Sequence, residues 1–370
     1  MRREITANSV YMKLIILLLS FGLFSCSTTE RPEYDRGSNL NSFNDLFANR
    51  SSSKNIGRSK SSAEALAGAL EAEQKGDLDK ALYYYIQSLQ FDPENAAVFL
   101  KIAQIHEQRG NNSIAVRAYS EAVKNDPTLI PAYQGLGVVH MEMRKYKQAQ
   151  EYLQKAILLD QKRLSEQDAE KEDEYYLLDK GSPTNSYNAL GILEDMHGNF
   201  DLARTYYNLA LNANENSANI LSNIGYSYYL AGELNSAERY FKRAINVDNQ
   251  YKRAWTNLGL IYVQKGQYNR AVKTLKQVIE EFEAYNELGY FLMLDGHLED
   301  AEYFFQKAIN MSPSYYEKAY SNLEQVRIKK HELWLLENEA QGDEAELDLN
   351  VGDASVWSGI SAGMTLENGN

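Results

Sequence analysis

The chain has 370 residues and a formal charge of −13, because it contains 38 Lys and Arg residues but 51 Asp and Glu residues. A surface of that sign repels phosphates, which argues against a nucleic-acid binder. Apolar residues make up 44% of the chain and charged residues 24%, a balance that favours a folded protein over a disordered one. The single cysteine, Cys26, excludes an intramolecular disulfide and a zinc site built from clustered cysteines.

The N-terminal segment contains an apolar run of eleven residues, from Leu14 to Phe24. A helix needs about 20 residues to cross a bilayer, so this run is too short to span one and suits the core of a signal peptide. A basic residue, Lys13, precedes the run, as in signal peptides. Met12 and Met1 both remain possible start residues.

The end of this run, Leu23-Phe24-Ser25-Cys26, resembles a bacterial lipobox. The resemblance implies cleavage after residue 25 and a diacylglyceryl group and an N-acyl chain on Cys26. Several chains anchor a protein firmly, because each buried CH₂ contributes about 0.8 kcal/mol. Ser27 stands where a signal for inner-membrane retention has Asp, so the resemblance implies the outer membrane, facing the periplasm. The alternative is an ordinary cleaved signal peptide with an incidental cysteine.

Residues 27–60 are rich in Ser, Asn and Arg and have no sustained helical period, which predicts a flexible tether. A short apolar patch at residues 43–47 is either incidental or a docking segment.

A sequence repeat extends over most of the rest of the chain. Alanines recur at spacings of 34, 34, 54, 34, 34 and 30 residues, a glycine stands five residues before six of these seven alanines, and an aromatic residue or leucine stands four residues after each. Glycine suits a turn between two helices, and small residues let the helices approach closely. The repeated alanines are Ala81, Ala115, Ala149, Ala203, Ala237, Ala271 and Ala301.

This pattern resembles the tetratricopeptide repeat over about residues 62–315. The resemblance implies an all-α superhelical solenoid of about seven helix pairs, in which each pair covers the apolar face of its neighbour. We expect a capping helix after the last pair, from Tyr316 to about Ala340.

The predicted organisation has six parts. The charge-rich insertion is expected to lengthen the second helix of the third pair and then to form a loop, which is either a partner contact or a spacer. The C-terminal tail is expected to be acidic and disordered. The parts are a signal peptide (1–25), the lipidated cysteine with its tether (26–60), units 1–3 (61–160), the insertion (161–183), units 4–7 with the capping helix (184–340) and the tail (341–370).

Two motifs that carry enzymatic chemistry are missing from the sequence. It contains no phosphate-binding loop of the Gly-x-x-x-x-Gly-Lys type and no His-Glu-x-x-His helix. His106 and His140 lie one repeat apart, but Tyr228 and Tyr262 occupy the equivalent position later, so packing is favoured over metal binding. We expect no catalytic or metal site, no small-molecule substrate, and no cofactor other than the covalent lipid.

The resemblance also implies a peptide-binding groove lined by the first helix of each pair. Asparagine can offer both a donor and an acceptor to a peptide backbone, and aromatic and aliphatic side chains can bury those of a ligand. The alternative for each position is packing between neighbouring helices. The predicted groove residues are Asn188, Asn219, Asn223, Tyr226, Tyr229, Asn257, Leu260, Val263, Asn286, Tyr290 and Met293.

The combination of lipobox, tether and repeats resembles the TadD-type lipoproteins of tight-adherence (Flp) pilus systems. The segments NIGYSYYLAG (223–232), YNELGY (285–290) and AEYFF (301–305) carry this resemblance. It implies a scaffold that binds proteins of the pilus secretion apparatus, with the outer-membrane secretin as the expected partner. Two rival interpretations stay open: an NlpI-like adaptor that docks peptidoglycan hydrolases, and a type IV pilus pilotin.

Overall fold

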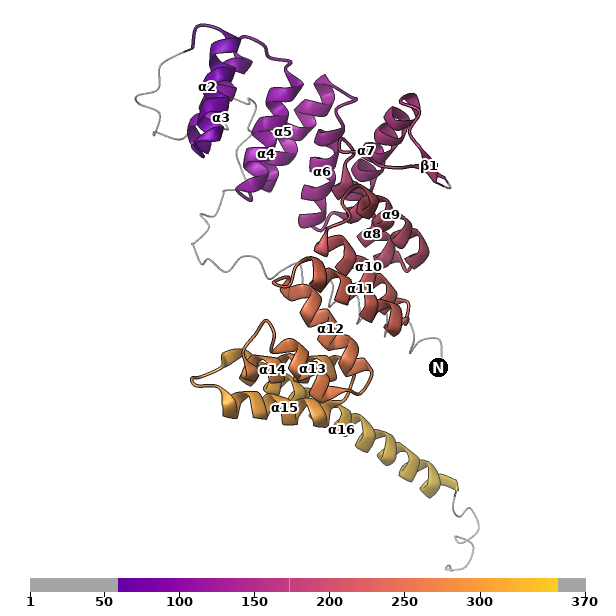
Figure 1. Ribbon diagram of the computed structural model, residues 1–370. Coiled ribbons are helices and arrows are strands. Elements are labelled where there is room, and N and C mark those ends of the chain that lie inside the picture. Colours follow the sequence, from indigo (N-terminus) through magenta and orange to yellow (C-terminus); the bar gives the residue numbers. More distant parts are fainter. Residues whose placement is uncertain (1–58, 173, 352–370) are drawn as a thin grey trace, which may run out of the picture. The chain divides into compact units, whose positions relative to one another are not determined.

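The computed structural model describes residues 59–172 and 174–351, and the ribbon in these ranges is almost entirely helical (Figure 1). The expected all-α fold of tandem helix pairs is confirmed. The first helices of the seven pairs are α2 (Ser62–Gln74), α4 (Ala96–Gln108), α6 (Ile130–Glu142), α8 (Thr184–His197), α10 (Ala218–Leu230), α12 (Lys252–Gln264) and α14 (Glu281–Leu294).

The second helices follow them in the same order and precede one long C-terminal helix. They are α3 (Leu78–Leu89), α5 (Asn112–Asn125), α7 (Tyr146–Glu166), α9 (Phe200–Ala213), α11 (Leu234–Val247), α13 (Tyr268–Leu275), α15 (Leu298–Met311) and finally α16 (Glu317–Val351). No helix in the described ranges is both long enough and apolar enough to cross a bilayer.

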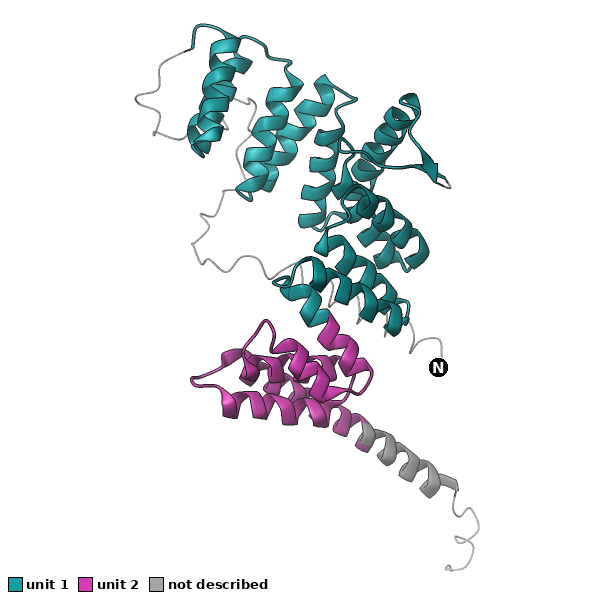
Figure 2. Ribbon diagram, viewed as in Figure 1, with its two compact units in different colours: residues 1–257 teal, residues 258–370 magenta. Residues whose placement is uncertain are grey.

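The helices form two compact units, which divide between Asn257 and Leu258 within α12 (Figure 2). Unit 1 holds α2 to α11 and the first half of α12, and unit 2 holds the second half of α12 and α13 to α16. The insertion lies inside unit 1.

Within unit 1, the first helices form an inner layer. Helix α4 contacts α6, α6 contacts α8, and α8 contacts α10, while each second helix packs mainly against its own first helix and the first helix of the next pair. Elements on the inside of a curved stack approach one another more closely than those on the outside. The first helices therefore line the inner layer, and the second helices form the outer layer.

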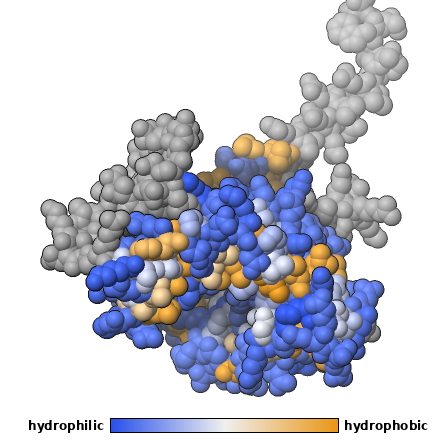
Figure 3. Space-filling view, turned by 90° about the horizontal axis from the view of Figure 1, so that it is seen from above, coloured by the Kyte–Doolittle hydropathy of each residue, from blue (hydrophilic) through white to orange (hydrophobic). Residues whose placement is uncertain are grey.

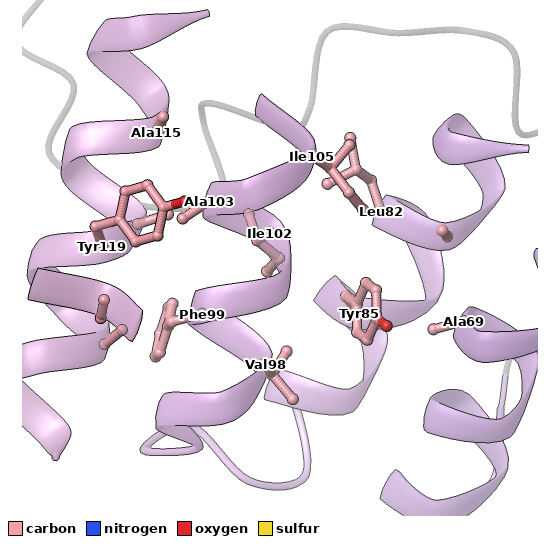
Figure 4. Close-up of a cluster of buried hydrophobic side chains, with 14 of the residues drawn as sticks. Ala69, Leu82, Tyr85, Val98, Phe99, Ile102, Ala103, Ile105, Ala115 and Tyr119 are labelled. Carbon is pink, nitrogen blue, oxygen red and sulfur yellow. The ribbon is translucent and has the colours of Figure 1, made fainter. Parts of the chain in front are cut away.

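The core lies between the two layers, where small residues face large ones. In the first pairs of unit 1, the rings of Tyr85 and Tyr119 are buried among alanines and aliphatic side chains (Figure 4). A Cβ atom added to Gly191 of α8 would lie only 2.5 Å from the ring of Tyr207 on α9. Close approach of the two helices of this pair therefore requires a residue without a side chain.

The insertion begins as predicted, because α7 is lengthened to 21 residues. The loop that follows contains a pair of two-residue antiparallel strands, β1 (Lys171–Glu172) and β2 (Tyr175–Tyr176), which the sequence analysis does not predict. Gln161 fixes β2 to α7: its Nε2 donates to the Tyr176 carbonyl at 3.1 Å, and its Oε1 accepts from the Tyr176 amide at 2.8 Å.

A charged network fixes the end of the insertion to the same helix. The Arg163 guanidinium donates to both oxygens of Asp179 at 2.8 Å and to the buried Asp160 at 2.6 Å. Arg163 lowers the pKa of Asp179 to about 2, through the hydrogen bonds that it donates. Bidentate, charge-assisted pairs of this kind are strong and directional, so the insertion is tied to the body of unit 1.

Two elements of unit 2 depart from the regular repeat. Helix α13 has only 8 residues, which accounts for the shortened spacing of 30 between the last two repeated alanines. Helix α16 continues to Val351, so residues 341–351, expected in a disordered tail, are helical. Ala, Glu and Leu are strong helix formers and recur in this stretch.

One turn between paired helices departs from the glycine rule. Six glycines at the equivalent position have φ between 68° and 85°, whereas Arg144 has φ 58° in the turn between α6 and α7. A left-handed conformation costs a residue with a side chain roughly 1–2 kcal/mol.

We therefore expect Arg144→Gly to stabilise unit 1 by roughly 0.5–1 kcal/mol, since the greater freedom of glycine in the unfolded chain offsets part of the gain. Urea unfolding followed by circular dichroism measures the change. The matched control is Gly110→Ala, at the equivalent turn, with φ 70° in the wild type. It should destabilise the protein by about 1 kcal/mol. A lower unfolding midpoint for Arg144→Gly contradicts the assignment of strain.

Candidate functional site

The predicted groove residues of unit 1 all lie on first helices, so they belong to the inner layer. Asn188 is on α8, and Asn257 is on α12. Asn219 is exposed and Asn188 is half-buried, whereas Asn257 is only 8% exposed. The remaining three, all on α10, are 2% exposed each: Asn223, Tyr226 and Tyr229.

Three of the asparagines form hydrogen bonds with neighbouring side chains. Asn223 Nδ2 donates to Asn188 Oδ1 at 2.8 Å, and the hydroxyl of Tyr251 donates to Asn219 Oδ1 at 3.2 Å. The first of these bonds joins the first helices of two successive pairs. It therefore contributes to stacking, a role that the sequence analysis does not assign to these residues.

Other polar atoms of the same layer are left without partners. Ser222 Oγ, Asn223 Oδ1 and Asn257 Nδ2 are buried and have no hydrogen-bond partner among the described residues. A buried polar atom without a partner costs about 1–3 kcal/mol, so each such atom needs an explanation. The inner layer of α10 and α12 in unit 1 thus contains hydrogen-bond acceptors and a donor that have no partner among the described residues.

In unit 2 the predicted groove residues are also mostly covered. Tyr290 is half-buried, while Leu260, Val263, Asn286 and Met293 are buried. Asn286 Oδ1 accepts a hydrogen bond of 3.0 Å from Asn322 Nδ2 on α16. Asn322 is absent from the sequence-based prediction, although it follows Asn286 by 36 residues, close to the repeat length.

The inner layer is more open at the start of unit 1, in helices that the prediction left out. Leu70 on α2 is 49% exposed, and Leu100 on α4 and Val138 on α6 are half-buried. Lys101 Nζ bridges to the Glu73 carboxylate of the preceding pair at 3.2 Å. Figure 3 shows hydrophobic side chains gathered in patches on one hydrophilic face of the molecule.

Three helix pairs of unit 1 contain a tyrosine facing a carboxylate. The hydroxyl of Tyr207 donates to Asp195 Oδ2 at 2.8 Å, and the hydroxyl of Tyr119 donates to Glu107. Tyr85 and Glu73 occupy the same two positions in the first pair, but the buried Tyr85 hydroxyl has no hydrogen-bond partner among the described residues. In the other four helix pairs the tyrosine position holds Leu153, Phe241, Leu275 or Phe305, and the carboxylate position holds Met141, Tyr229, Val263 or Met293.

Two of these carboxylates, Glu107 and Asp195, have raised pKa values. Burial raises the pKa of Glu107, and burial raises the pKa of Asp195 to about 7, against the hydrogen bonds from Ser227 and Tyr207 and the nearby charge of Arg204. Between about pH 4 and 7 the folded state therefore holds a proton on Asp195 that the unfolded state has lost.

Stability should consequently fall as the pH rises from about 4 to 7, by up to about 1.4 kcal/mol per pH unit from this group alone. Asp195→Asn keeps an acceptor for Tyr207 and removes the ionisation. We expect the variant to gain stability over the wild type at pH 8 and to gain little at pH 4.5, in urea unfolding at both values. Glu151→Gln, at an exposed position of α7, is the control. An equal effect of Asp195→Asn at both pH values would show that the carboxyl does not titrate in this range.

His106 on α4 and His140 on α6 occupy packing positions. The ring of His140 lies edge-on to that of Tyr152, with centroids 5.3 Å apart, and His106 Nδ1 lies 3.4 Å from Asn111 Nδ2. Residues 59–172 and 174–351 contain no group of three or more His, Cys, Asp or Glu side chains that could hold a metal ion.

Comparison with protein families agrees with the repeat geometry. Three models, each described as a tetratricopeptide repeat, match the chain. The matched ranges are 66–130, 130–163, 216–280 and 256–316, which together cover more than half of the chain.

Solved structures resemble the chain at low sequence identity. A tetratricopeptide repeat protein from Parabacteroides merdae ATCC 43184 has 17% identity and a TM-score of 0.51, with 73% of this chain and 100% of that chain covered. YrrB, described as having an unusual peptide-binding site, has 19% identity and a TM-score of 0.40, with 59% and 96% covered. Pseudomonas aeruginosa pilF has 12% identity and a TM-score of 0.43, with 64% and 98% covered. The first of these similarities supports the shared fold.

Proposed function

Because this chain belongs to the tetratricopeptide repeat family, whose members are in general non-enzymatic scaffolds for protein–protein interaction, we propose that it binds an extended protein segment along its inner layer. We propose further that a lipid on Cys26 anchors it to the outer membrane, facing the periplasm, and that it serves the assembly of a tight-adherence (Flp) pilus.

The observation that carries the binding proposal is the set of unpaired polar atoms on α10 and α12 in unit 1. Asn223 Oδ1 is an acceptor and Asn257 Nδ2 is a donor, and the two lie on successive first helices. An extended peptide presents N–H and C=O groups along its length and can satisfy both atoms when its binding opens the inner layer, because both are buried in the free protein. Ligand binding would thus relieve the desolvation cost that these atoms carry in the free protein.

The anchor proposal depends on the N-terminal sequence, which lies outside the described residues. The lipobox-like run ending at Cys26 supports it, and the composition of residues 27–60 supports a tether between lipid and repeats. A scaffold held at a membrane raises the effective concentration of its partners there. That is what an assembly factor for a membrane-embedded apparatus needs.

The pilus proposal is supported by the resemblance of the repeat segments to TadD-type lipoproteins, and the partner proposed on that basis is the outer-membrane secretin. A photocrosslinking residue at Asn219, which is exposed on the inner layer, tests it in the native envelope. Recovery of a secretin or another pilus component supports the proposal. Recovery of peptidoglycan hydrolases alone supports the NlpI-like adaptor instead, and recovery of type IV pilus components supports the pilotin.

For the anchor, we expect Cys26→Ser to abolish incorporation of labelled palmitate and to release the protein from the outer-membrane fraction, because the modified side chain is lost. Ser27→Ala, which keeps the cysteine, is the matched control and should leave both labelling and fractionation unchanged. An unlabelled wild-type protein, or a Cys26→Ser protein that stays in the membrane fraction, contradicts a lipid anchor.

For the groove, Asn257→Leu replaces a buried amide by an apolar side chain of similar size. If the amide serves only a ligand, the free protein should keep or raise its unfolding midpoint, because the unpaired Nδ2 is removed. Affinity for the captured partner should fall at least about tenfold, or 1.4 kcal/mol. Asn246→Leu on the exposed face of α11 is the control and should not change the affinity. A destabilised variant with unchanged affinity means that Asn257 is structural.

A further inference from the structure

Basic and acidic residues are concentrated in two different segments of this chain, and the proposed peptide binding does not involve these charges. Residues 239–279 contain nine Lys and Arg residues and one Asp, although the whole chain is at −13. Residues 332–370 contain nine Asp and Glu residues and no Lys or Arg. Segments of opposite sign attract each other when they meet, so the place of each in the fold matters.

The basic segment includes an exposed face on the outer layer of unit 1, on helix α11. Arg239, Lys242 and Arg243 are all exposed there, at a spacing that puts them on one side of the helix. Lys242 forms an ion pair of 2.7 Å with Glu238, and Arg239 and Arg243 lie over the ring of Tyr240, at 5.7 and 5.0 Å from its centroid. A hollow of about 390 Å³ is lined by Asn235, Glu238, Arg239, Lys242, Arg243 and Asn246.

Helix α13 of unit 2 repeats this arrangement. Lys273 and Lys276 follow Arg239 and Lys242 by 34 residues, one repeat length, and both are exposed. Lys276 bridges to Glu281 at 2.7 Å. Two successive second helices therefore present basic side chains at the same register positions.

The acidic segment begins on α16. The first part of this helix packs in unit 2 through the buried side chains of Ala319, Leu323 and Val326. Beyond this contact the apolar run from Leu333 to Leu336 is exposed, and Trp334 is 57% exposed. Acidic residues then follow at 337, 339, 343, 344, 346 and 348.

The stretch from residue 332 to Val351 is about 30 Å long as a continuous helix. It extends past the packed part of unit 2 (Figure 1). Within unit 2, α16 packs against α15 and α14, so a continuous α16 does not turn back to α13.

We propose that the chain associates with itself, and that the acidic half of α16 (residues 337–351) of one copy binds the basic outer face of α11 in a second copy. The two segments carry opposite charge, and the exposed run Leu333–Leu336 adds apolar area directly before the acidic segment. The α13 face offers a second site of the same kind. Because the two surfaces differ, the contact is head-to-tail and leaves a free surface at each end.

Light scattering of the full chain tests this, with Cys26→Ser included so that lipid does not drive association. We expect the mass to rise with protein concentration at about 0.1 M salt and to return to the monomer at about 1 M, where the screening length falls from about 10 Å to 3 Å. A protein that stays monomeric at every concentration in low salt overturns the proposal. This outcome includes the case in which α16 binds its own chain instead of a second copy.

Charge reversal identifies the surfaces. Arg239→Glu with Arg243→Glu should weaken self-association at least tenfold, and so should Glu344→Lys with Asp348→Lys. Mixing the two variants should restore association at 1:1 stoichiometry, because the unchanged α16 of the first variant meets the unchanged α11 of the second, and the reversed α11 of the first meets the reversed α16 of the second. The control is Lys147→Glu with Lys155→Glu, both exposed on α7, another outer-layer helix, which should leave association unchanged.

Two results of this experiment contradict the proposal. One is association that survives both reversals at full strength. The other is a wild-type chain that stays monomeric but binds vesicles of phosphatidylglycerol and phosphatidylcholine and loses this binding with Arg239→Glu and Arg243→Glu. That result would assign the basic face to an anionic lipid surface.

Discussion

The close approach of the two helices in each pair is the contact on which the rest of this structure depends. At Gly191 and Gly225 of the first helices, the ring of the second helix leaves no room for a side chain. An added Cβ atom would lie 2.5 Å from the ring of Tyr207 in the first case and 2.9 Å from the ring of Phe241 in the second. This contact sets the separation of the two helices. It thereby sets the apolar face that the pair offers to its neighbour, and a single pair cannot bury that face alone.

Much of the fold could be predicted from the sequence, because its contacts join residues within one or two repeat lengths. The spacing of alanines such as Ala203 and Ala237, which are fully buried, identifies the pairs. What could not be predicted depends on contacts or conformations outside the repeat. Examples are the network around Arg163 that ties down the insertion, the left-handed Arg144, and the continuation of α16 to Val351.

The candidate site was predicted less completely. The residues expected in the groove do lie on the first helices, but whether a side chain such as Asn223 is free or bonded to Asn188 depends on the distance between successive pairs, which periodicity does not give. The accessible Leu70 is not among the predicted groove residues, which all come from units 4–7. The tyrosine–carboxylate pairs could have been found in the sequence, by comparing two positions across all seven units.

Those pairs bear on how such a chain can diversify. Tyr207 donates a hydrogen bond to Asp195, whereas the same two positions of the last pair hold Phe305 and Met293. A genetic crossover in the turn between the two helices of a pair would bring a hydroxyl against an apolar wall, or an acid against a hydrocarbon ring. A crossover between pairs keeps each match intact. Whole helix pairs are therefore the smallest pieces that duplication and exchange can move without harm to the core.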